Sequence, residues 1–310
     1  MKAQNGYKAG VSKPDINIDV LHQWLGARLG EPITDVQPLD GGFWSSAFAF
    51  RADTRELVIR FNPDPSGFLI DAKAMQFENL PIPKVLDIGE GLGFHYAISE
   101  RHYGTFLELF EDNPTEAAKK LISSLANQDT PKVANVNWFE EDQSQTYAWR
   151  SWLLDSLYRA QDSVTSSHPA ITLSRCLEIL EHHADDIPER RDLVHGDLLH
   201  QNVLVSETGD IETIFSWKCS ALGDFLFDVA WLGIWIPWHP ALQHVDFGSR
   251  FLGDLSVPSD ALENATLRRY LYTLQIGAHH LGWFSSIKDT ENLMKMNSYL
   301  ERAIETGPRD

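Results

Sequence analysis

Residues 195–202 (HGDLLHQN) combine an aspartate and an asparagine at a spacing that suits phosphoryl transfer from ATP. In that chemistry a carboxylate orients the attacking hydroxyl group, and an amide oxygen five residues later holds Mg²⁺. Asp197 and Asn202 fit these two roles. Apolar runs at 193–194 and 203–205 would pin such a loop to a rigid scaffold. A solvated turn capped by its own Asp and Asn side chains is the alternative, but the pattern is specific and favours a catalytic loop.

Ser216 breaks this pattern. The stretch 214–217 (IFSW) lies where a second metal ligand, a carboxylate, is expected. Mg²⁺ prefers anionic oxygens, so a hydroxyl there costs on the order of a few kcal/mol of transition-state stabilisation. The chain could be a substituted variant of an active kinase, a natural enzyme with a weakened or different metal arrangement, or a pseudokinase kept for binding. Asp210, Glu212 and Asp224 are near enough in sequence to replace the carboxylate if the fold turns one of them inward.

The elements that position these residues fall into two groups. Residues 17–29 predict a helix capped by Asn17, and residues 68–79 predict a second helix. Strands are predicted at 33–39, 43–50, 56–61, 84–88 and 94–99. From about residue 106 the helical spacing dominates, at 114–127, 146–161, 170–185 and 260–283, with short strands only at 203–205 and 211–215. We therefore expect an α+β chain with a small antiparallel sheet lobe (1–98) and a larger helical lobe (99–310).

Several of these motifs together resemble the aminoglycoside phosphotransferases, relatives of choline kinase with a protein-kinase-like fold. They are residues 195–202, Gly209-Asp210, Trp217, Gly223-Asp224 and 228–230 (DVA). Matches at 81–90 (PIPKVLDIGE), 149–150, 235–238 (WIPW) and 267–271 extend the resemblance over almost the whole chain. The resemblance implies a two-lobed kinase-like fold, ATP or GTP and Mg²⁺ as cofactors, and a small-molecule acceptor. It also implies that Asp228 is a buried acid that orders the catalytic loop.

The segment 40–46 occupies the place of the nucleotide loop in this family. Backbone N–H groups of Gly41 and Gly42 could contact ATP phosphates, and Ser45 or Ser46 could add a hydroxyl group. Two glycines by themselves would suit an ordinary hairpin turn equally well. Their position in the chain favours the nucleotide loop.

Arg60 stands where most kinases carry the strand lysine that holds the nucleotide's phosphates. Arginine keeps the charge and adds a fork suited to phosphate, whereas a solvated strand-end arginine is the alternative. We predict Asp71 as its acidic partner, with Glu78 as the competitor. Ser99 and Glu100 would form the hinge whose backbone meets adenine, unless they simply end a strand.

Composition limits the kind of partner. The formal net charge of -18, from 26 Lys+Arg and 44 Asp+Glu, argues against nucleic acid and fits either a cationic substrate or simple solubility. Two cysteines cannot form a disulfide framework, residues 1–14 lack a secretory signal, and the longest apolar run, 229–238, is too short to cross a bilayer. We expect a cytoplasmic protein without a membrane role.

Two further segments have two interpretations each. The acidic residues 140–142 could line the entrance for a cationic substrate or form a solvated loop. Trp231, Trp235 and Trp238 could stack on a ligand or fill the core of the helical lobe.

We predict an ATP-dependent phosphotransferase that acts on a hydroxyl group of a small, cationic or sugar-containing molecule. Asp197 would be the base or orienting group, Asn202 the remaining metal ligand beside Ser216, and Arg60 the phosphate clamp. The competing hypotheses are a pseudokinase-like protein that binds a nucleotide or small molecule and responds by lobe closure, and an enzyme of another reaction class on the same scaffold.

Overall fold

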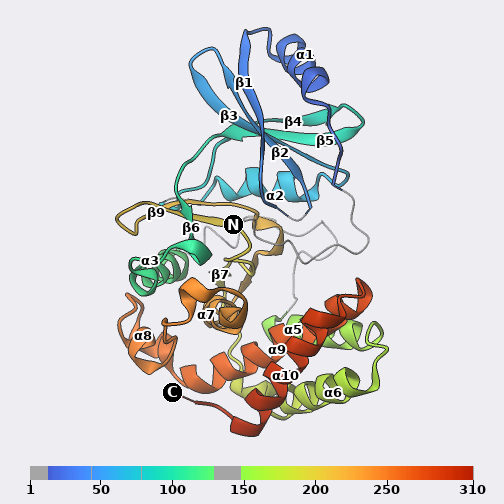
Figure 1. The fold of residues 1–310 in the computed structure, drawn as a ribbon. Coiled ribbons are helices and arrows are strands. Elements are labelled where there is room, and N and C mark those ends of the chain that lie inside the picture. Colours follow the sequence, from blue (N-terminus) through green and yellow to red (C-terminus); the bar gives the residue numbers. More distant parts are fainter. Residues whose placement is uncertain (1–12, 43, 78, 129–147, 310) are drawn as a thin grey trace. The chain divides into compact units, whose positions relative to one another are not determined.

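The computed structural model describes residues 13–42, 44–77, 79–128 and 148–309. The chain forms two compact units, which are described one by one (Figure 1). The sheet unit contains Gly10–Phe110 and Leu199–Cys219, and the helical unit contains Glu111–Leu198 and Ser220–Asp310. The chain leaves the sheet unit after Phe110 and returns to it at Leu199, and the lobe boundary expected after residue 98 stays a prediction.

The sheet unit is built on a five-stranded antiparallel sheet in the order β1-β2-β3-β5-β4. The strands are β1 (Ile33–Leu39), β2 (Ser46–Ala52), β3 (Arg55–Asn62), β4 (Val85–Gly91) and β5 (Phe94–Glu100). These bounds agree closely with the predicted strands. The second strand begins three residues later than expected, after the glycine turn; Phe43 lies outside the described residues.

Two helices accompany this sheet. Helix α1 (Ile18–Leu29) begins at Asn17, whose side chain accepts hydrogen bonds from two backbone N–H groups as predicted, and it ends at Gly30 with φ 68°. Its buried residues Leu21 and Leu25 join the apolar side chains of the sheet in one core cluster. Helix α2 (Ser66–Ala74) starts earlier and ends earlier than predicted.

A small second sheet completes the sheet unit. Strands β6 (Thr105–Phe106), β8 (Val203–Val205) and β9 (Ile211–Ile214) pair antiparallel in the order β6-β8-β9. The 3₁₀ turns η1 (Leu107–Leu109) and η4 (Trp217–Cys219) follow β6 and β9. Pairing of β8 with β6 places the second half of the catalytic-loop segment in the sheet unit.

The helical unit is organised around helix α9 (Ala265–Ser286), which packs against α5, α6, α7 and α10 (Figure 1). The other helices are α3 (Pro114–Ala126), α5 (Trp149–Gln161), α6 (Ser167–His182), α7 (Leu226–Ile234), α8 (Ser249–Gly253) and α10 (Thr290–Thr306), with 3₁₀ turns η3 (Ala184–Asp186), η5 (Ile236–Trp238), η6 (Pro240–Leu242) and η7 (Ser259–Leu262). Strands β7 (Asp192–Val194) and β10 (Ala221–Gly223) pair antiparallel. Helix α10 was not predicted, although Leu293, Met296 and Leu300 bury one face of it.

The aromatic run of α7 and η5 belongs to the core of the helical unit. Trp231 and Trp235 are buried, and their rings contact each other and His280. Trp238 is half-buried, and the Lys295 ammonium group lies 4.2 Å from its ring centroid. The core interpretation of these tryptophans therefore fits the structure. The acidic residues 140–142 lie outside the described residues.

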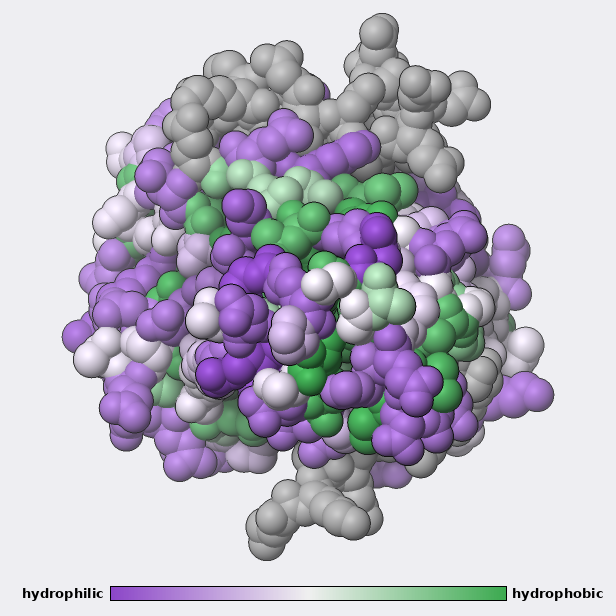
Figure 2. All heavy atoms as spheres, turned by 90° about the horizontal axis from the view of Figure 1, so that it is seen from above, coloured by the Kyte–Doolittle hydropathy of each residue, from purple (hydrophilic) through white to green (hydrophobic). Residues whose placement is uncertain are grey.

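The one face of the molecule drawn in Figure 2 carries mainly hydrophilic residues, with hydrophobic side chains gathered in smaller areas. None of the helices in the described ranges is long and apolar enough to cross a membrane.

Candidate active site

The first half of the catalytic loop is held by Asp228 of α7. Its two carboxylate oxygens accept hydrogen bonds from the backbone N–H groups of His195 (2.7 Å) and Gly196 (2.8 Å). Asp228 is fully buried, and this burial raises its pKa to about 7, with a smaller contribution from the charge of Asp197. The buried acid implied by the family resemblance is therefore present. It fixes the backbone directly before Asp197.

A hydrogen bond within the loop also holds the backbone of Asp197. Its N–H donates to Nδ1 of His195 (3.2 Å), which makes this nitrogen the acceptor. His195 is fully buried, so its ring holds the loop from the protein interior. Gly196, between them, adopts φ 75°, a conformation that glycine reaches without steric cost.

The second half of the loop belongs to the sheet unit. His200 and Gln201 are both left-handed, with φ 60° and 70°. The Gln201 N–H donates to the buried carboxylate of Glu108 (2.6 Å), and the carbonyl of Asn202 accepts from Phe215 N–H (2.7 Å). The backbone of Asn202, the predicted metal ligand, is thereby joined to the segment that contains Ser216.

Asp71 connects Arg60 with this same segment. Oδ2 of Asp71 accepts from Nη2 of Arg60 (2.7 Å), and Oδ1 accepts from the backbone N–H of Trp217 (2.9 Å), the residue after Ser216. The ring of Phe68 lies 5.3 Å from the Arg60 guanidinium carbon. The predicted Arg60–Asp71 pair is present, and Glu78, its predicted competitor, lies outside the described residues.

A small cavity lies beside this pair. Its volume is about 10 Å³, room for about one water molecule. The charged and polar lining residues are Arg60, Asp71 and Ser99, and the apolar ones are Ile82, Pro83, Val85, Ile214, Phe215 and Trp217. Of the predicted site residues, Arg60, Asp71 and Ser99 are thus brought together.

The predicted hinge residues continue strand β5. Ser99 is buried and pairs with Val58 of β3. The backbone N–H of Glu100 donates to the carbonyl of Lys84 (3.1 Å), and that of Arg101 donates to Glu56 (3.1 Å). These two N–H groups extend the sheet, so the strand-end interpretation describes Ser99 and Glu100 in this structure. Contact with adenine stays a prediction.

The predicted nucleotide loop is a turn between β1 and β2. Gly41 and Gly42 adopt φ 117° and 61°, which explains why glycine is needed at both positions. The Ser45 hydroxyl accepts from the Asn62 side chain (3.1 Å), and the Ser46 hydroxyl donates to the carbonyl of Pro14 (2.5 Å). Both hydroxyl groups therefore support the turn.

Two further residues contact this turn, and the sequence did not point to either. Nζ of Lys13 donates to the Gly41 carbonyl (2.8 Å), and Oε1 of Gln201 accepts from the Gly42 N–H (2.9 Å). Burial lowers the pKa of Lys13, and the charge of Asp40 opposes this. Lys13 belongs to a polar stretch without a recognisable pattern, and Gln201 was only a spacer in the loop motif. The one signal in the sequence was that Gln201 directly precedes Asn202 in the loop motif.

Each of the three acids considered as a replacement for the carboxylate at position 216 has surroundings of its own. Asp210 accepts from the Thr208 hydroxyl (2.9 Å) in the β8–β9 turn, and Glu212 is exposed on β9. Asp224 is buried in the helical unit. Within the described ranges, no group of three or more His, Cys, Asp or Glu side chains is arranged to hold a metal ion. Asn202 and Ser216 alone are neutral donors and fit Mg²⁺ poorly.

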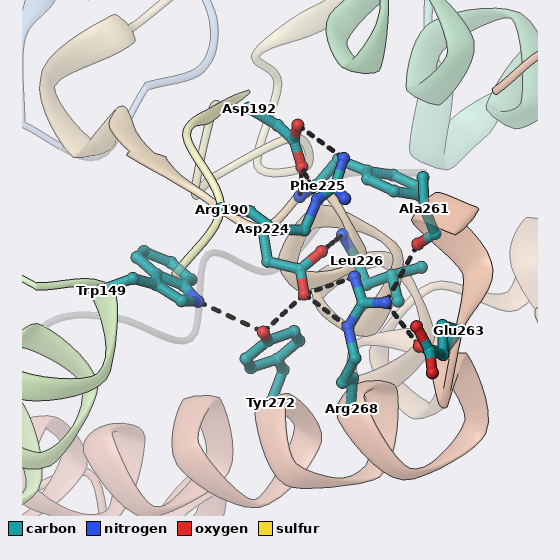
Figure 3. Close-up of polar contacts among 10 residues, drawn as sticks. All are labelled: Trp149, Arg190, Asp192, Asp224, Phe225, Leu226, Ala261, Glu263, Arg268 and Tyr272. Carbon is teal, nitrogen blue, oxygen red and sulfur yellow. Dashed lines mark hydrogen bonds and ion pairs between the residues drawn. The ribbon is translucent and has the colours of Figure 1, made fainter. Parts of the chain in front are cut away.

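Asp224 is the acceptor at the centre of a buried network (Figure 3). Its carboxylate pairs with Arg268 (2.6 Å to Nη2) and accepts hydrogen bonds from the Tyr272 hydroxyl (2.6 Å) and Leu226 N–H (3.1 Å). Trp149 in turn donates its indole N–H to Tyr272 (3.2 Å). Burial raises the pKa of Asp224, and the charge of Arg268 opposes this. The network joins α5, α7 and α9, and we interpret it as structural.

Comparison with known proteins places this site in a family. Residues 35–260 match the model of the phosphotransferase enzyme family (APH), and the chain belongs to this family. The chain is 28% identical over 246 residues to hygromycin-B 4-O-kinase of Escherichia coli, covering 75% of this chain and 71% of that protein. The resemblance to aminoglycoside phosphotransferases predicted from the motifs is confirmed.

Solved structures show the same fold. The crystal structure of aminoglycoside phosphotransferase APH(4)-Ia superposes with a TM-score of 0.78 at 23% identity and covers 94% of this chain and 99% of that chain. A ternary complex of a thermostable mutant of APH(4)-Ia with AMP-PNP and hygromycin B gives a TM-score of 0.76 at 25% identity, again covering 94% and 99%. The predicted two-lobed kinase-like fold, with a sheet lobe and a larger helical lobe, is confirmed.

Proposed function

We propose that the protein transfers a phosphoryl group from ATP or GTP to a hydroxyl group of a small, cationic or sugar-containing molecule. The observation that carries this proposal is the catalytic loop. Asp228 holds the backbone of His195 and Gly196 through both of its oxygens, which leaves Asp197 at the end of a fixed segment. The match of residues 35–260 to a phosphotransferase family supports the same chemistry.

In this mechanism Asp197 orients the acceptor hydroxyl and takes its proton as the acceptor oxygen bonds to the terminal phosphorus of the nucleotide, while the bond from that phosphorus to the bridging oxygen breaks and ADP or GDP leaves. Arg60 binds the phosphates, and Asp71 and Phe68 keep its guanidinium group in a fixed orientation. The N–H groups of Gly41 and Gly42 provide further contacts to the phosphates. Ser99 and Glu100 are proposed to border the adenine ring. We assign nucleotide binding to residues 1–98, and the catalytic loop and acceptor site to residues 99–310.

Mg²⁺ remains a prediction from the family resemblance. The neutral oxygens of Asn202 and Ser216 would contact it, and neither supplies the negative charge that this ion prefers. For this reason we expect a slow enzyme. An enzyme of this kind loses transition-state stabilisation on the order of a few kcal/mol when one charged ligand near the transferred group is missing.

The relatives suggest the chemical class of the acceptor. The name of hygromycin-B 4-O-kinase gives hygromycin B as the molecule it phosphorylates, and a chain of net charge -18 attracts a cationic acceptor. We therefore propose an aminocyclitol or a related amino alcohol. Both cysteines are free thiols, which suits the reducing cytoplasm as its location.

The test is a transfer assay with ATP whose terminal phosphate is radiolabelled. Hygromycin B, other aminocyclitols and simple amino alcohols serve as acceptors. We expect labelled product with the unaltered protein and its loss with Asp197→Asn, which keeps the size of the side chain but removes the proton acceptor. Equal turnover in the two proteins, with substrate in excess, would remove Asp197 from the mechanism.

One observation favours a second function, the binding of a nucleotide without its transfer. Ser216 stands where a metal carboxylate is expected, Asp210 and Asp224 contact Thr208 and Arg268, and Glu212 is exposed. A protein of this kind would bind ATP and show no labelled product with any acceptor. Restoring the carboxylate by Ser216→Asp separates the two functions, because only a site that is otherwise complete would gain activity.

A further inference from the structure

The glycine turn makes two contacts that the proposed mechanism does not use. The N–H group of Gly42 donates to the side-chain oxygen of Gln201, and the ammonium group of Lys13 donates to the carbonyl of Gly41. All four residues belong to the sheet unit. Adjacent residues of one turn therefore offer a backbone N–H donor, at Gly42, and hold the Lys13 ammonium group, at Gly41.

The position of Gln201 is imposed by its surroundings. Gln201 and His200 are consecutive residues with positive φ, a conformation that residues other than glycine adopt rarely and keep only where neighbours enforce it. The buried carboxylate of Glu108 accepts from the Gln201 N–H (2.6 Å) and holds this conformation. The side chain is thereby aimed at the turn.

Gly41 is shaped to receive this side chain. A Cβ atom at Gly41 would lie 1.9 Å from Oε1 and 2.9 Å from Cδ of Gln201. Any residue with a side chain would therefore exclude Gln201 from the turn. The contact depends on a glycine at one end and a strained glutamine at the other.

The chemistry of this contact is that of a phosphate site occupied by a neutral acceptor. A phosphate oxygen would bond the Gly42 N–H more strongly than an amide oxygen does, because charge-assisted hydrogen bonds are about twice as strong as neutral ones. Lys13 brings a positive charge to the same turn. Burial has already lowered its pKa, so its ammonium form gains from an incoming anion.

We propose that Gln201 occupies the position of a nucleotide phosphate oxygen at Gly42 in the nucleotide-free protein. When the nucleotide binds, its phosphate displaces the Gln201 side chain and is received by the Gly42 N–H and by Lys13. This inference rests on the nucleotide-binding function proposed above. Because Gln201 immediately precedes Asn202, phosphate binding at the turn also frees the loop residue next to the proposed metal ligand.

The experiment measures the affinity for MgATP by calorimetry. Gln201→Ala, Gln201→Asn and Gln201→Gly all remove an oxygen that reaches the turn, and each is expected to tighten MgATP binding by about two- to tenfold, since a neutral hydrogen bond no longer has to be broken. Gln201→Gly also suits φ 70°, so it keeps the test valid if the other variants fold poorly. Gln201→Glu places a competing carboxylate on the turn and is expected to weaken binding by about tenfold or more.

Lys13→Met keeps the length of the side chain without its charge and is expected to weaken MgATP binding by about tenfold. The matched control is Arg55→Met. Arg55 begins β3 and pairs with Glu31, and it faces Ala52, at the opposite end of β2 from the glycine turn. This control also removes one positive charge from the sheet unit, and it is expected to keep the affinity of the unaltered protein.

Weaker MgATP binding by Gln201→Ala and Gln201→Gly would show that Gln201 is itself a nucleotide ligand and would overturn the proposal. Unchanged affinity in both variants would overturn it as well. Adenosine and inorganic tripolyphosphate serve as separate probes. If neither they nor MgATP bind to any variant, the nucleotide function fails together with this inference; if MgATP binds equally to all variants, only the inference fails.

Discussion

Asp71 is the residue whose removal should affect the sheet unit and its proposed nucleotide site together. Asp71 is 5% exposed. Its carboxylate accepts hydrogen bonds from Arg60 of β3 and from the backbone N–H of Trp217, directly after Ser216. Asp71→Ala removes both contacts, whereas Asp71→Asn keeps an oxygen for the Trp217 N–H and loses the charge that pairs with Arg60. The two variants therefore separate the ion pair from the backbone contact.

The size of the effect follows from these contacts. A hydrogen bond to a charged group contributes about 1.5–3 kcal/mol, and a buried N–H left without a partner costs about 1–3 kcal/mol. The Arg60 side chain is 23% exposed and can be partly rehydrated, so we take the lower part of this range. We expect Asp71→Ala to reduce the free energy of unfolding by about 3 kcal/mol and Asp71→Asn by roughly half as much.

Chemical denaturation, followed by tryptophan fluorescence, measures these differences, and calorimetry with MgATP measures the loss of nucleotide affinity. The matched control is Glu31→Ala. Glu31 pairs with Arg55 of β3, and side-chain exposures of 36% and 48% make this an ordinary surface pair worth about 0–1 kcal/mol. The reasoning is refuted if Glu31→Ala costs as much as Asp71→Ala, or if Asp71→Ala changes neither stability nor affinity.

Three further predictions concern the helical unit. Burial raises the pKa of Asp228 above its value in the unfolded chain, so the free energy of unfolding should fall as pH rises from about 4 to about 7. Asp228→Asn should flatten this dependence in urea titrations at a series of pH values. An unchanged slope in this variant would contradict the prediction. Gly223→Ala would place a Cβ 2.3 Å from the Trp149 ring and should cost about 1–3 kcal/mol in the same assay, unless the ring can move aside. Tyr272→Phe removes a hydroxyl donor from buried Asp224 and should cost about 1–3 kcal/mol, and a neutral effect would argue against the network.

The fold and the charged pair of the site were predictable because they depend on local patterns. Alternating apolar residues predicted the bounds of the five strands closely. The order of elements predicted Arg60 on a strand and Asp71 on the helix that follows it. Helix α10 was missed, although its buried residues recur at helical spacing. The motif around Asp197 predicts the catalytic loop, and the catalytic role of Asp197 stays a prediction.

The contacts of the glycine turn could not be predicted. Gln201 lies 159 residues from Gly42 in the sequence, and its orientation depends on positive φ angles that no local pattern signals in a residue other than glycine. Whether Glu100 is a hinge or a strand end depends on its hydrogen bond to Lys84, which is set by the register of β4 and β5. Whether a neighbouring acid replaces the carboxylate missing at Ser216 depends on side-chain direction, and spacing does not determine it.

The most direct test of the phosphotransferase function is the rate of labelled phosphate transfer by Ser216→Asp compared with the unaltered protein. Ser216 has φ 61°, a conformation that aspartate tolerates better than most residues, so the substitution should fold. We expect transfer to an aminocyclitol, or ATP hydrolysis, to rise by about a hundredfold or more, with a stronger dependence on Mg²⁺. If the unaltered protein shows neither reaction, and a folded Ser216→Asp protein binds MgATP and shows neither reaction as well, the phosphotransferase function is contradicted and nucleotide binding alone is favoured.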